Sequence, residues 1–300
     1  RLLAMLLCLP FLLIFISGCG SSSQKKDEPP VYSPLQVLVP EATGKETLGS
    51  SPMILDVSNI SQGYFIAQSD SDLTCSLQII SPSGVLYSYF IAPGESATVT
   101  FTEGSGDYTI TGYQQVQGDQ YAALYSETVT VQLENDFLPF LYPNQYVNFT
   151  PDSKASQLAL SLIDEDTVDV DALQQIYDYV VSNLTYDYEK ADTVTTGYLP
   201  DVDETLQTGT GICFDYAALT TAMLRSCDIP CKLQIGYAGD IKHAWIDVYI
   251  RSKGWVNQAV SFKGDTWTLM DPTFDSNSDD KEAIQDYIGD ESNYTVQFTR

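Results

Sequence analysis

The sequence predicts an all-β domain followed by an α+β domain, and three observations support this prediction. Between Ser71 and Leu133 apolar and polar residues alternate, as they do in half-buried β-strands. Beyond Asn135 the apolar residues recur at helical spacing instead. After residue 231 the pattern returns to short strands, and helices followed by a sheet are typical of the α+β class. With 300 residues and 44% hydrophobic content, the chain is long and apolar enough for two domains with cores.

Residues 51–134 are predicted to form a β-sandwich. Leu73, Cys75, Leu77 and Ile79 share one side of a predicted strand, and similar short patterns recur up to Leu133. Segments rich in Gly, Pro, Ser and Asp separate these patterns and supply tight turns. Short strands with regular turns are typical of immunoglobulin-like sandwiches. No residue cluster here suggests chemistry, so we expect a spacer or a recognition module, with the cell wall as one candidate partner.

Residues 135–300 are predicted to form the α+β domain. Two amphipathic helices are expected first, and Asp169 and Asp171 stand where the dipole of the second helix favours negative charge. A third helix, beginning at Cys213, is apolar or small nearly all round and is therefore predicted to be buried. The expected helices span Ser153–Ile163, Val170–Leu184 and Cys213–Arg225, and the expected strands span Lys232–Tyr237, His243–Ile250, Gly254–Asn257 and Thr266–Met270.

Residues 1–19 are predicted to be an export signal. Leu2–Ile16 is almost wholly apolar but shorter than the roughly 20 residues that a bilayer span needs. The segment Ile16-Ser17-Gly18-Cys19 resembles the bacterial lipobox, which implies that Cys19 carries diacylglycerol; an ordinary signal cut near Gly18 is the alternative. Residues 20–50, rich in Ser, Gly, Pro, Lys and Glu, are predicted to be a disordered tether. We therefore expect an extracytoplasmic protein, lipid-anchored to the bacterial membrane through Cys19.

Charge and cysteine content exclude several functions. The formal charge is −26, from 40 acidic and 14 basic side chains, and it repels phosphates, so nucleic acid binding is not expected. One histidine and no closely paired CxxC motif give poor support for a metal site, and no cofactor is expected. Cys227 and Cys231 are close enough in sequence to form a local disulfide, and two buried free thiols are the alternative.

Three residues of the second domain are candidates for a catalytic triad. A thiol is a useful nucleophile as a thiolate, and the N–H groups and dipole of a helix N-terminus stabilise that anion. Cys213 is expected in such a first turn. His243 is the chain's one histidine and the residue type best suited to act as general base. Asp271, at a predicted strand end, is suited to orient the imidazole. Taken singly, each has a plain structural reading as a buried thiol, a hydrogen-bonded histidine or a turn.

The residues around these positions resemble the transglutaminase-like superfamily, which shares its catalytic core with papain-type proteases. The order and spacing of four segments carry the resemblance: Gly209–Ala217, Leu224–Pro230, His243–Trp245 and Trp267–Thr273. The resemblance implies a papain-like fold with Cys213 as nucleophile, His243 as base and Asp271 as the orienting carboxylate. The backbone N–H of Cys213 is a candidate oxyanion donor, and the resemblance suggests Tyr186 as a second. The segment Asp228–Lys232 departs from the family's usual Gly-Ile-Pro-Ala-Arg, away from the triad positions.

This resemblance predicts a cell-surface thiol enzyme that acts on a peptide or glutaminyl amide carbonyl. Cys213 would form a thioester, which water resolves in a peptidase or amidase and a lysine resolves in a cross-linking transglutaminase. We favour hydrolysis because many bacterial members of the family resemble proteases. A cross-linker, a non-catalytic module that binds a peptide or wall polymer, and a scaffold in which Cys213 only packs remain as alternatives. The expected partner is a peptide or protein substrate.

Overall fold

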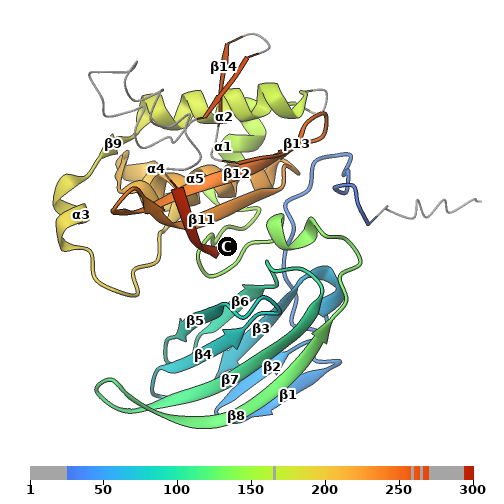
Figure 1. Ribbon diagram of the computed structural model, residues 1–300, viewed down its shortest axis with the longest axis vertical. Coiled ribbons are helices and arrows are strands. Elements are labelled where there is room, and N and C mark those ends of the chain that lie inside the picture. Colours follow the sequence, from blue (N-terminus) through green and yellow to red (C-terminus); the bar gives the residue numbers. More distant parts are fainter. Residues whose placement is uncertain (1–25, 165–166, 258–259, 264–265, 270–293) are drawn as a thin grey trace, which may run out of the picture.

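The computed structural model describes residues 26–164, 167–257, 260–263, 266–269 and 294–300, with only the backbone of 260–263 and 266–269. The predicted signal segment with Cys19, and the triad candidate Asp271, lie outside the described residues. One part of the molecule consists of strands, and the other consists of helices around a sheet (Figure 1). Within the described chain, no helix combines the length and the hydropathy that a membrane crossing requires.

Two antiparallel four-stranded sheets make up the first part and share one core. Cys75, Leu77 and Ile79 face this core as expected, whereas Leu73 precedes β4 and is exposed. The all-β region begins at Thr47, slightly before the predicted boundary at residue 51. One sheet has the order β1 (Thr47–Ser50), β2 (Met53–Asp56), β3 (Tyr64–Ser69) and β6 (Ser96–Thr100), and the other β5 (Leu86–Ile91), β4 (Cys75–Ile80), β7 (Gly106–Gln117) and β8 (Gln120–Val131).

Residues 26–46, which precede β1, run along both parts of the molecule (Figure 1). Their composition predicted a disordered tether through residue 50, but Pro29, Pro30, Val37 and Leu38 are buried. The guanidinium of Arg251 donates to the carbonyls of Pro29 and Pro30, at 3.2 and 3.0 Å. The tether prediction therefore does not hold for residues 26–50. Composition could not reveal this, because the partners of the buried side chains are distant in sequence.

Five α-helices occur in the described part of the second region. The predicted helices near residues 154, 170 and 213 are confirmed to within about a residue at each end. The structure adds two helices of 6 and 7 residues, which were too short to be predicted from apolar spacing. The helices are α1 (Lys154–Leu162), α2 (Asp169–Asn183), α3 (Tyr188–Thr193), α4 (Val202–Thr208) and α5 (Cys213–Ser226), and single 3₁₀ turns lie at Ile60–Gln62 and Leu138–Phe140. Helix α5 is buried along nearly its whole length, as its sequence predicted.

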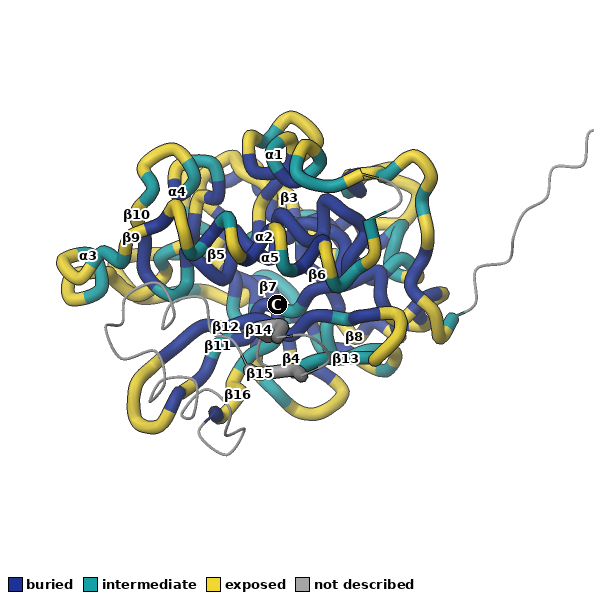
Figure 2. The backbone as a smooth tube through the Cα atoms, turned by 90° about the horizontal axis from the view of Figure 1, so that it is seen from above, coloured by how far each residue is buried: buried dark blue, intermediate teal, exposed yellow. Residues whose placement is uncertain are grey.

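An antiparallel sheet packs on α5. Its strand order is β13 (Gly254–Val256), β12 (Ile241–Ile250), β11 (Cys231–Ala238) and β16 (Tyr294–Thr299), and the strands β14 (Val260–Lys263) and β15 (Thr266–Leu269) pair separately. Ala244, Ile246 and Val248 of β12 belong to the same core as α5. Trp245 faces the other side of the sheet, where its ring lies 5.1 Å from that of Tyr294. Figure 2 shows buried backbone along β11 and β12, and exposed backbone around α3 at the rim.

A fully buried arginine satisfies backbone carbonyls at the end of α5. Arg225 donates to the carbonyl of Tyr142 at 2.8 Å, to that of Cys231 at 3.0 and 2.8 Å, and to that of Arg300 at 2.9 Å. Burial lowers the pKa of Arg225 to about 10, so the side chain stays charged at neutral pH. Arg225 therefore ties α5 to β11, to the connector before α1 and to the residue after β16.

The two parts of the molecule meet around Arg300 and Tyr146. The guanidinium of Arg300 lies 4.0 Å from the ring centre of Tyr146 and donates to the hydroxyl of Tyr89 on β5 at 2.8 Å. Tyr146 in turn donates to the carbonyl of Ser88 at 2.8 Å. A cation held against aromatic faces in a desolvated position gains energy that an exposed cation does not. These contacts fasten the all-β part to the helical part.

We expect Arg225→Met to lower the free energy of unfolding by about 3 kcal/mol or more, because buried carbonyl oxygens then lose their donor. Urea unfolding followed by circular dichroism measures the loss. Arg251→Met is the matched control; its guanidinium also binds carbonyls but is partly exposed, so we expect a loss of about 1 kcal/mol or less. Equal losses in the two variants would contradict this account of α5.

Asp228 is a buried carboxyl in the turn between α5 and β11. It is 5% exposed and adopts φ 58°, a left-handed conformation that Asp and Asn tolerate better than most residues. Burial raises its pKa to about 7, although the N–H of Tyr32, at 3.3 Å, and the charge of Arg251 oppose this shift. Because the folded-state pKa lies above the unfolded value, the stability that this carboxyl contributes is present at low pH. It is lost as pH rises from about 4 to about 7.

Asp228→Asn should remove this loss, because the amide stays neutral and suits the same backbone conformation. Relative to the wild type, the free energy of unfolding of the variant should therefore rise by about 2–4 kcal/mol between pH 4.5 and pH 8. Urea unfolding at both pH values measures this difference. A constant difference between the two proteins at both pH values would show that Asp228 is charged in the folded state throughout the range.

Candidate active site

Two short parallel strands lead into α5. Helix α4 ends at Gly209, whose φ of 64° lies in the left-handed region that glycine adopts without strain. The next residues form β10 (Thr210–Gly211), which pairs with β9 (Thr185–Tyr186). This pairing fixes the direction in which the chain enters α5.

The first turn of α5 is closed by Asp215. The N–H of Ile212 donates to the carboxylate of Asp215 at 2.8 Å, so the third residue of the helix caps the residue before it. A Cβ on Gly211 would lie 2.6 Å from the Cβ of Asp215, which explains the glycine at this position. The helix consequently begins at Cys213.

Cys213 differs from the other described cysteines. It is half-buried, whereas Cys75, Cys227 and Cys231 are buried. All four are free, so Cys227 and Cys231 do not form the local disulfide that the sequence left open. Burial raises the pKa of Cys227 and of Cys231 to about 12, which keeps both as neutral thiols. Among the described cysteines, only Cys213 combines access to solvent with a helix N-terminus that favours an anion.

His243 lies at the same end of the domain as Cys213. Helix α5 has 14 residues and so is about 21 Å long, and β11, with eight residues, runs back along it for about 26 Å. Both β11 and β12 contact α5. The end of β11 and the start of β12 thus return to the level of the first turn of α5. His243 is the third residue of β12.

The imidazole of His243 lies on the Trp245 side of the sheet. Its ring stacks with that of Trp245 at 6.3 Å and approaches that of Tyr294 at 6.5 Å. Ala244, the next residue, faces α5 instead. The side chain is 6% exposed. His243 therefore lies near the start of β12, with its imidazole on the face of that strand opposite to Ala244.

Tyr186 lies next to the segment that precedes Cys213. It pairs with Gly211 across β9 and β10, and the N–H of Asp187 donates to the carbonyl of Gly211 at 2.9 Å. The ring of Tyr186 lies 6.5 Å from that of Tyr216 on α5. The backbone of Tyr186 therefore lies beside Gly211, two residues before Cys213.

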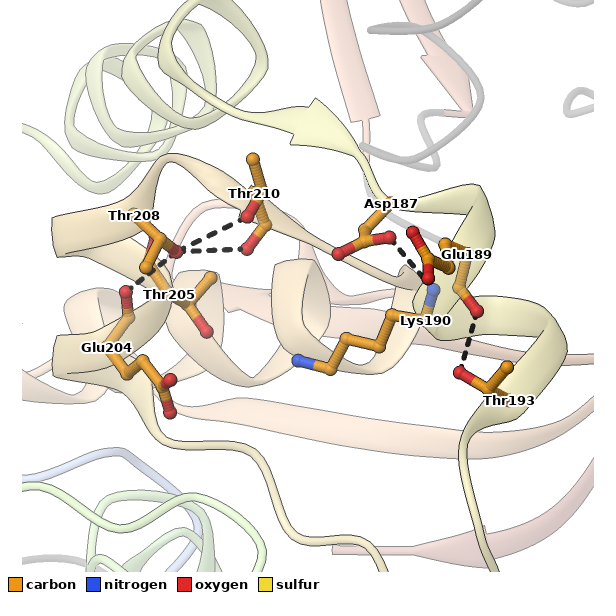
Figure 3. Close-up of a pocket in the computed structure, with 8 residues that line it drawn as sticks. All are labelled: Asp187, Glu189, Lys190, Thr193, Glu204, Thr205, Thr208 and Thr210. Atoms are coloured by element: carbon orange, nitrogen blue, oxygen red, sulfur yellow. Dashed lines mark hydrogen bonds between the residues drawn. The ribbon is translucent and has the colours of Figure 1, made fainter.

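An open cavity of about 380 Å³ lies between α3, α4 and β10 (Figure 3). It is lined by Asp187, Glu189, Lys190, Thr193, Glu204, Thr205, Thr208 and Thr210. Cys213 and His243 do not line it. Within the described part of the chain, no group of His, Cys, Asp and Glu is arranged to hold a metal ion. The side chain of Lys190 extends from α3 across the cavity toward α5 (Figure 3).

Residues 156–272 match the sequence model of the transglutaminase-like superfamily. This segment is therefore similar to the core domain of that superfamily. The match includes Cys213, His243 and Asp271, and it extends from within α1 to beyond β15. The mixed helix and strand content of the matched segment agrees with the predicted papain-like α+β fold. Asp271 lies inside the matched range but outside the described residues.

Solved structures similar to the chain include two bacterial proteins and a fish enzyme. A candidate cysteine protease from Cytophaga hutchinsonii is 16% identical, with a TM-score of 0.38, over 85% of this chain and 84% of that protein. The periplasmic domain of TgpA from Pseudomonas aeruginosa is 14% identical, with a TM-score of 0.34, over 77% of this chain and 93% of that domain. Red sea bream transglutaminase is 14% identical, with a TM-score of 0.27, over 72% of this chain and 48% of that protein. No curated protein matches the chain.

Sequence reasoning missed the charged group that closes the first turn of the buried helix α5. Lys190 forms an ion pair with Asp215 at 2.8 Å, and Tyr198 donates to the same carboxylate at 2.5 Å. The sequence did contain one signal for the cap, because Asp215 lies three positions after Ile212 and an acidic residue at that spacing typically caps a helix N-terminus. No local pattern links it to Lys190 or Tyr198, which lie on and after the short helix α3.

We expect iodoacetamide at neutral pH to alkylate Cys213 at least about tenfold faster than Cys75, Cys227 or Cys231, because these three thiols are buried. Mass spectrometry of peptides from the briefly treated native protein measures each rate. In urea the four rates should become similar, which controls for the reactivity of each peptide. Equal and slow alkylation in the native protein would contradict an accessible, activated Cys213.

Proposed function

We propose that the protein is a thiol acyl-transfer enzyme that cleaves peptide or glutaminyl amide bonds, with Cys213 as nucleophile, His243 as base and Asp271 as the residue that orients the imidazole. The observation that carries this proposal is the position of Cys213. It is the half-buried first residue of α5, in a segment that matches the transglutaminase-like superfamily. A helix N-terminus stabilises a thiolate, and a thiolate is the nucleophile that thioester chemistry requires.

The proposed reaction has two halves. In the first, the sulfur of Cys213 attacks the amide carbonyl, the C–N bond breaks, and the imidazolium of His243 gives its proton to the leaving amine. In the second, water attacks the thioester while the imidazole takes its proton, and the acid and the free thiol are released. The N–H of Cys213 and the hydroxyl of Tyr186 are proposed to stabilise the oxyanion in both halves.

The proposal requires His243 to come within hydrogen-bonding reach of Cys213 in the substrate complex. Proton transfer needs a separation of about 2.6–3.2 Å or one bridging water, and such contacts often tighten only when substrate binds. The return of β12 to the level of the first turn of α5 supports this requirement. Asp271, which follows β15 by two residues in sequence, is proposed to accept the other imidazole N–H.

Transfer to a lysine amine instead of water is the alternative outcome for the same thioester. The chemistry at Cys213 is common to both, so the acceptor depends on what can enter beside the sulfur. A non-catalytic groove that binds a peptide or wall polymer is the second alternative, and the half-buried position of Cys213 favours catalysis over it.

The location of the protein is a further part of the proposal. We propose that residues 1–19 direct export, that a lipid on Cys19 anchors the protein to the outer face of the cell membrane, and that the all-β part is an immunoglobulin-like spacer or wall-binding module. The apolar run Leu2–Ile16 followed by Cys19 supports the first two statements. The two sheets around one core support the third. Metabolic labelling with a palmitate analogue should mark the wild type and leave Cys19→Ala unmarked.

Cys213→Ala should abolish turnover, and His243→Ala and Asp271→Asn should lower kcat by about 10²- to 10⁴-fold. Two assays on the purified full chain separate the outcomes. Ammonia or peptide release without incorporation of a fluorescent primary amine into a glutamine-containing protein indicates hydrolysis, and incorporation indicates cross-linking.

Cys75→Ala, in the all-β part, is the matched control and should keep full activity. If no thioester-dependent turnover is found and Cys213→Ala loses only about 1 kcal/mol of stability, as a small cavity would cost, the enzyme proposal fails. Circular dichroism of each variant confirms that it is folded.

A further inference from the structure

A closed three-residue network surrounds the carboxylate of Asp215, two residues after Cys213. The ammonium of Lys190 lies 2.8 Å from one oxygen of Asp215, and Tyr198 donates to the other oxygen at 2.5 Å. Lys190 also donates to the hydroxyl of Tyr198 at 2.7 Å. The oxygen that meets Lys190 also accepts the N–H of Ile212. Every member of the network therefore contacts the other two.

Burial makes this network necessary. Asp215 is fully buried, and a buried carboxylate without a cation is strongly disfavoured. Partial burial lowers the pKa of Lys190, but its bonds to Asp215 and Tyr198 more than compensate and raise that pKa above its ordinary value. Burial, and then the bond to Asp215, raise the pKa of Tyr198 to about 12. At neutral pH Lys190 is thus charged and Tyr198 is a neutral donor, so the positive charge balances that of Asp215.

The network also reaches the residue after the thiol. The ring of Tyr198 packs edge-on against that of Phe214 at 6.3 Å, and the Lys190 ammonium lies 4.6 Å from the centre of the Tyr198 ring. Tyr198 therefore holds both the capping carboxylate and the side chain that follows Cys213. The segment from α3 to Tyr198 is fastened to the first turn of α5 at these points.

We infer that Lys190 and Tyr198 are positioning residues for the Cys213 thiolate: they hold Asp215 in its capping position and cancel its negative charge in the first turn of α5, which Cys213 begins. The inference rests on the proposed function, in which Cys213 reacts as an anion. An unbalanced carboxylate two residues away would repel that anion, and a loosened cap would turn the first helical N–H groups away from it.

The test measures the rate of Cys213 alkylation by iodoacetamide as a function of pH, in the purified full chain, by mass spectrometry of the Cys213 peptide. With Lys190→Met, the midpoint of the rate profile should rise by about one pH unit, so that the rate below the midpoint falls about tenfold. Lys190→Arg should restore most of the rate, because it returns the charge. Tyr198→Phe, which keeps the ring and removes only the hydroxyl, should lower the rate by about two- to fivefold.

Lys154→Met is the matched control, since Lys154 donates to Gln207 at 2.9 Å on the exposed surface and should leave the profile unchanged. If Lys190→Met does not fold, as judged by circular dichroism, Tyr198→Phe carries the test, and an unshifted profile in that variant overturns the inference. In one outcome the alkylation profile of the wild type has its midpoint well below the roughly pH 8.5 of a free thiol, and neither Lys190→Met nor Tyr198→Phe shifts that midpoint. This outcome overturns the inference and leaves the proposed function intact. A wild-type midpoint at the free-thiol value overturns both.

Discussion

The burial of α5 is the constraint on which the rest of the second region depends. A helix enclosed on all sides can carry a charge only where the surrounding protein supplies a partner, and α5 carries one charge near each end. Asp215 is matched by Lys190 from α3, and Arg225 is matched by carbonyls from the connector, from β11 and from Arg300. The two ends thereby fix the elements around the helix. Cys213 and Phe214, the first two residues of α5, are half-buried, and the first N–H groups of a helix have no partner within the helix.

The same constraint explains how far the sequence could be interpreted. The apolar surface of α5 and the alternation in β12 follow from the local spacing of apolar residues, so both elements could be predicted. The orientation of the His243 ring toward Trp245 and Tyr294 depends on which face of the sheet packs on α5, and no local pattern states that. Likewise, the order of residues 26–50 depends on Arg251 and on other partners far along the chain.

The junction between the two parts affects the orientation of the all-β part relative to the helical part. Tyr146 packs against both cores and its hydroxyl reaches β5, while Arg300 lies over its ring. Such a junction favours a fixed angle between the all-β part and the helical part over independent motion of two domains joined by a linker. A recognition surface on the sheets would then present a bound polymer to the thiol-bearing end in one orientation.

Residues 26–46 pack against the folded protein, and this packing limits the distance between a lipid anchor and the folded domains. If Cys19 carries the lipid, only the residues up to Lys26 separate the acyl chains from the folded body, and a fully extended stretch of that length spans about 25 Å. The folded body would stay close to the bilayer surface. Its reach would favour substrates that are themselves membrane-bound or that pass through the membrane-proximal layer.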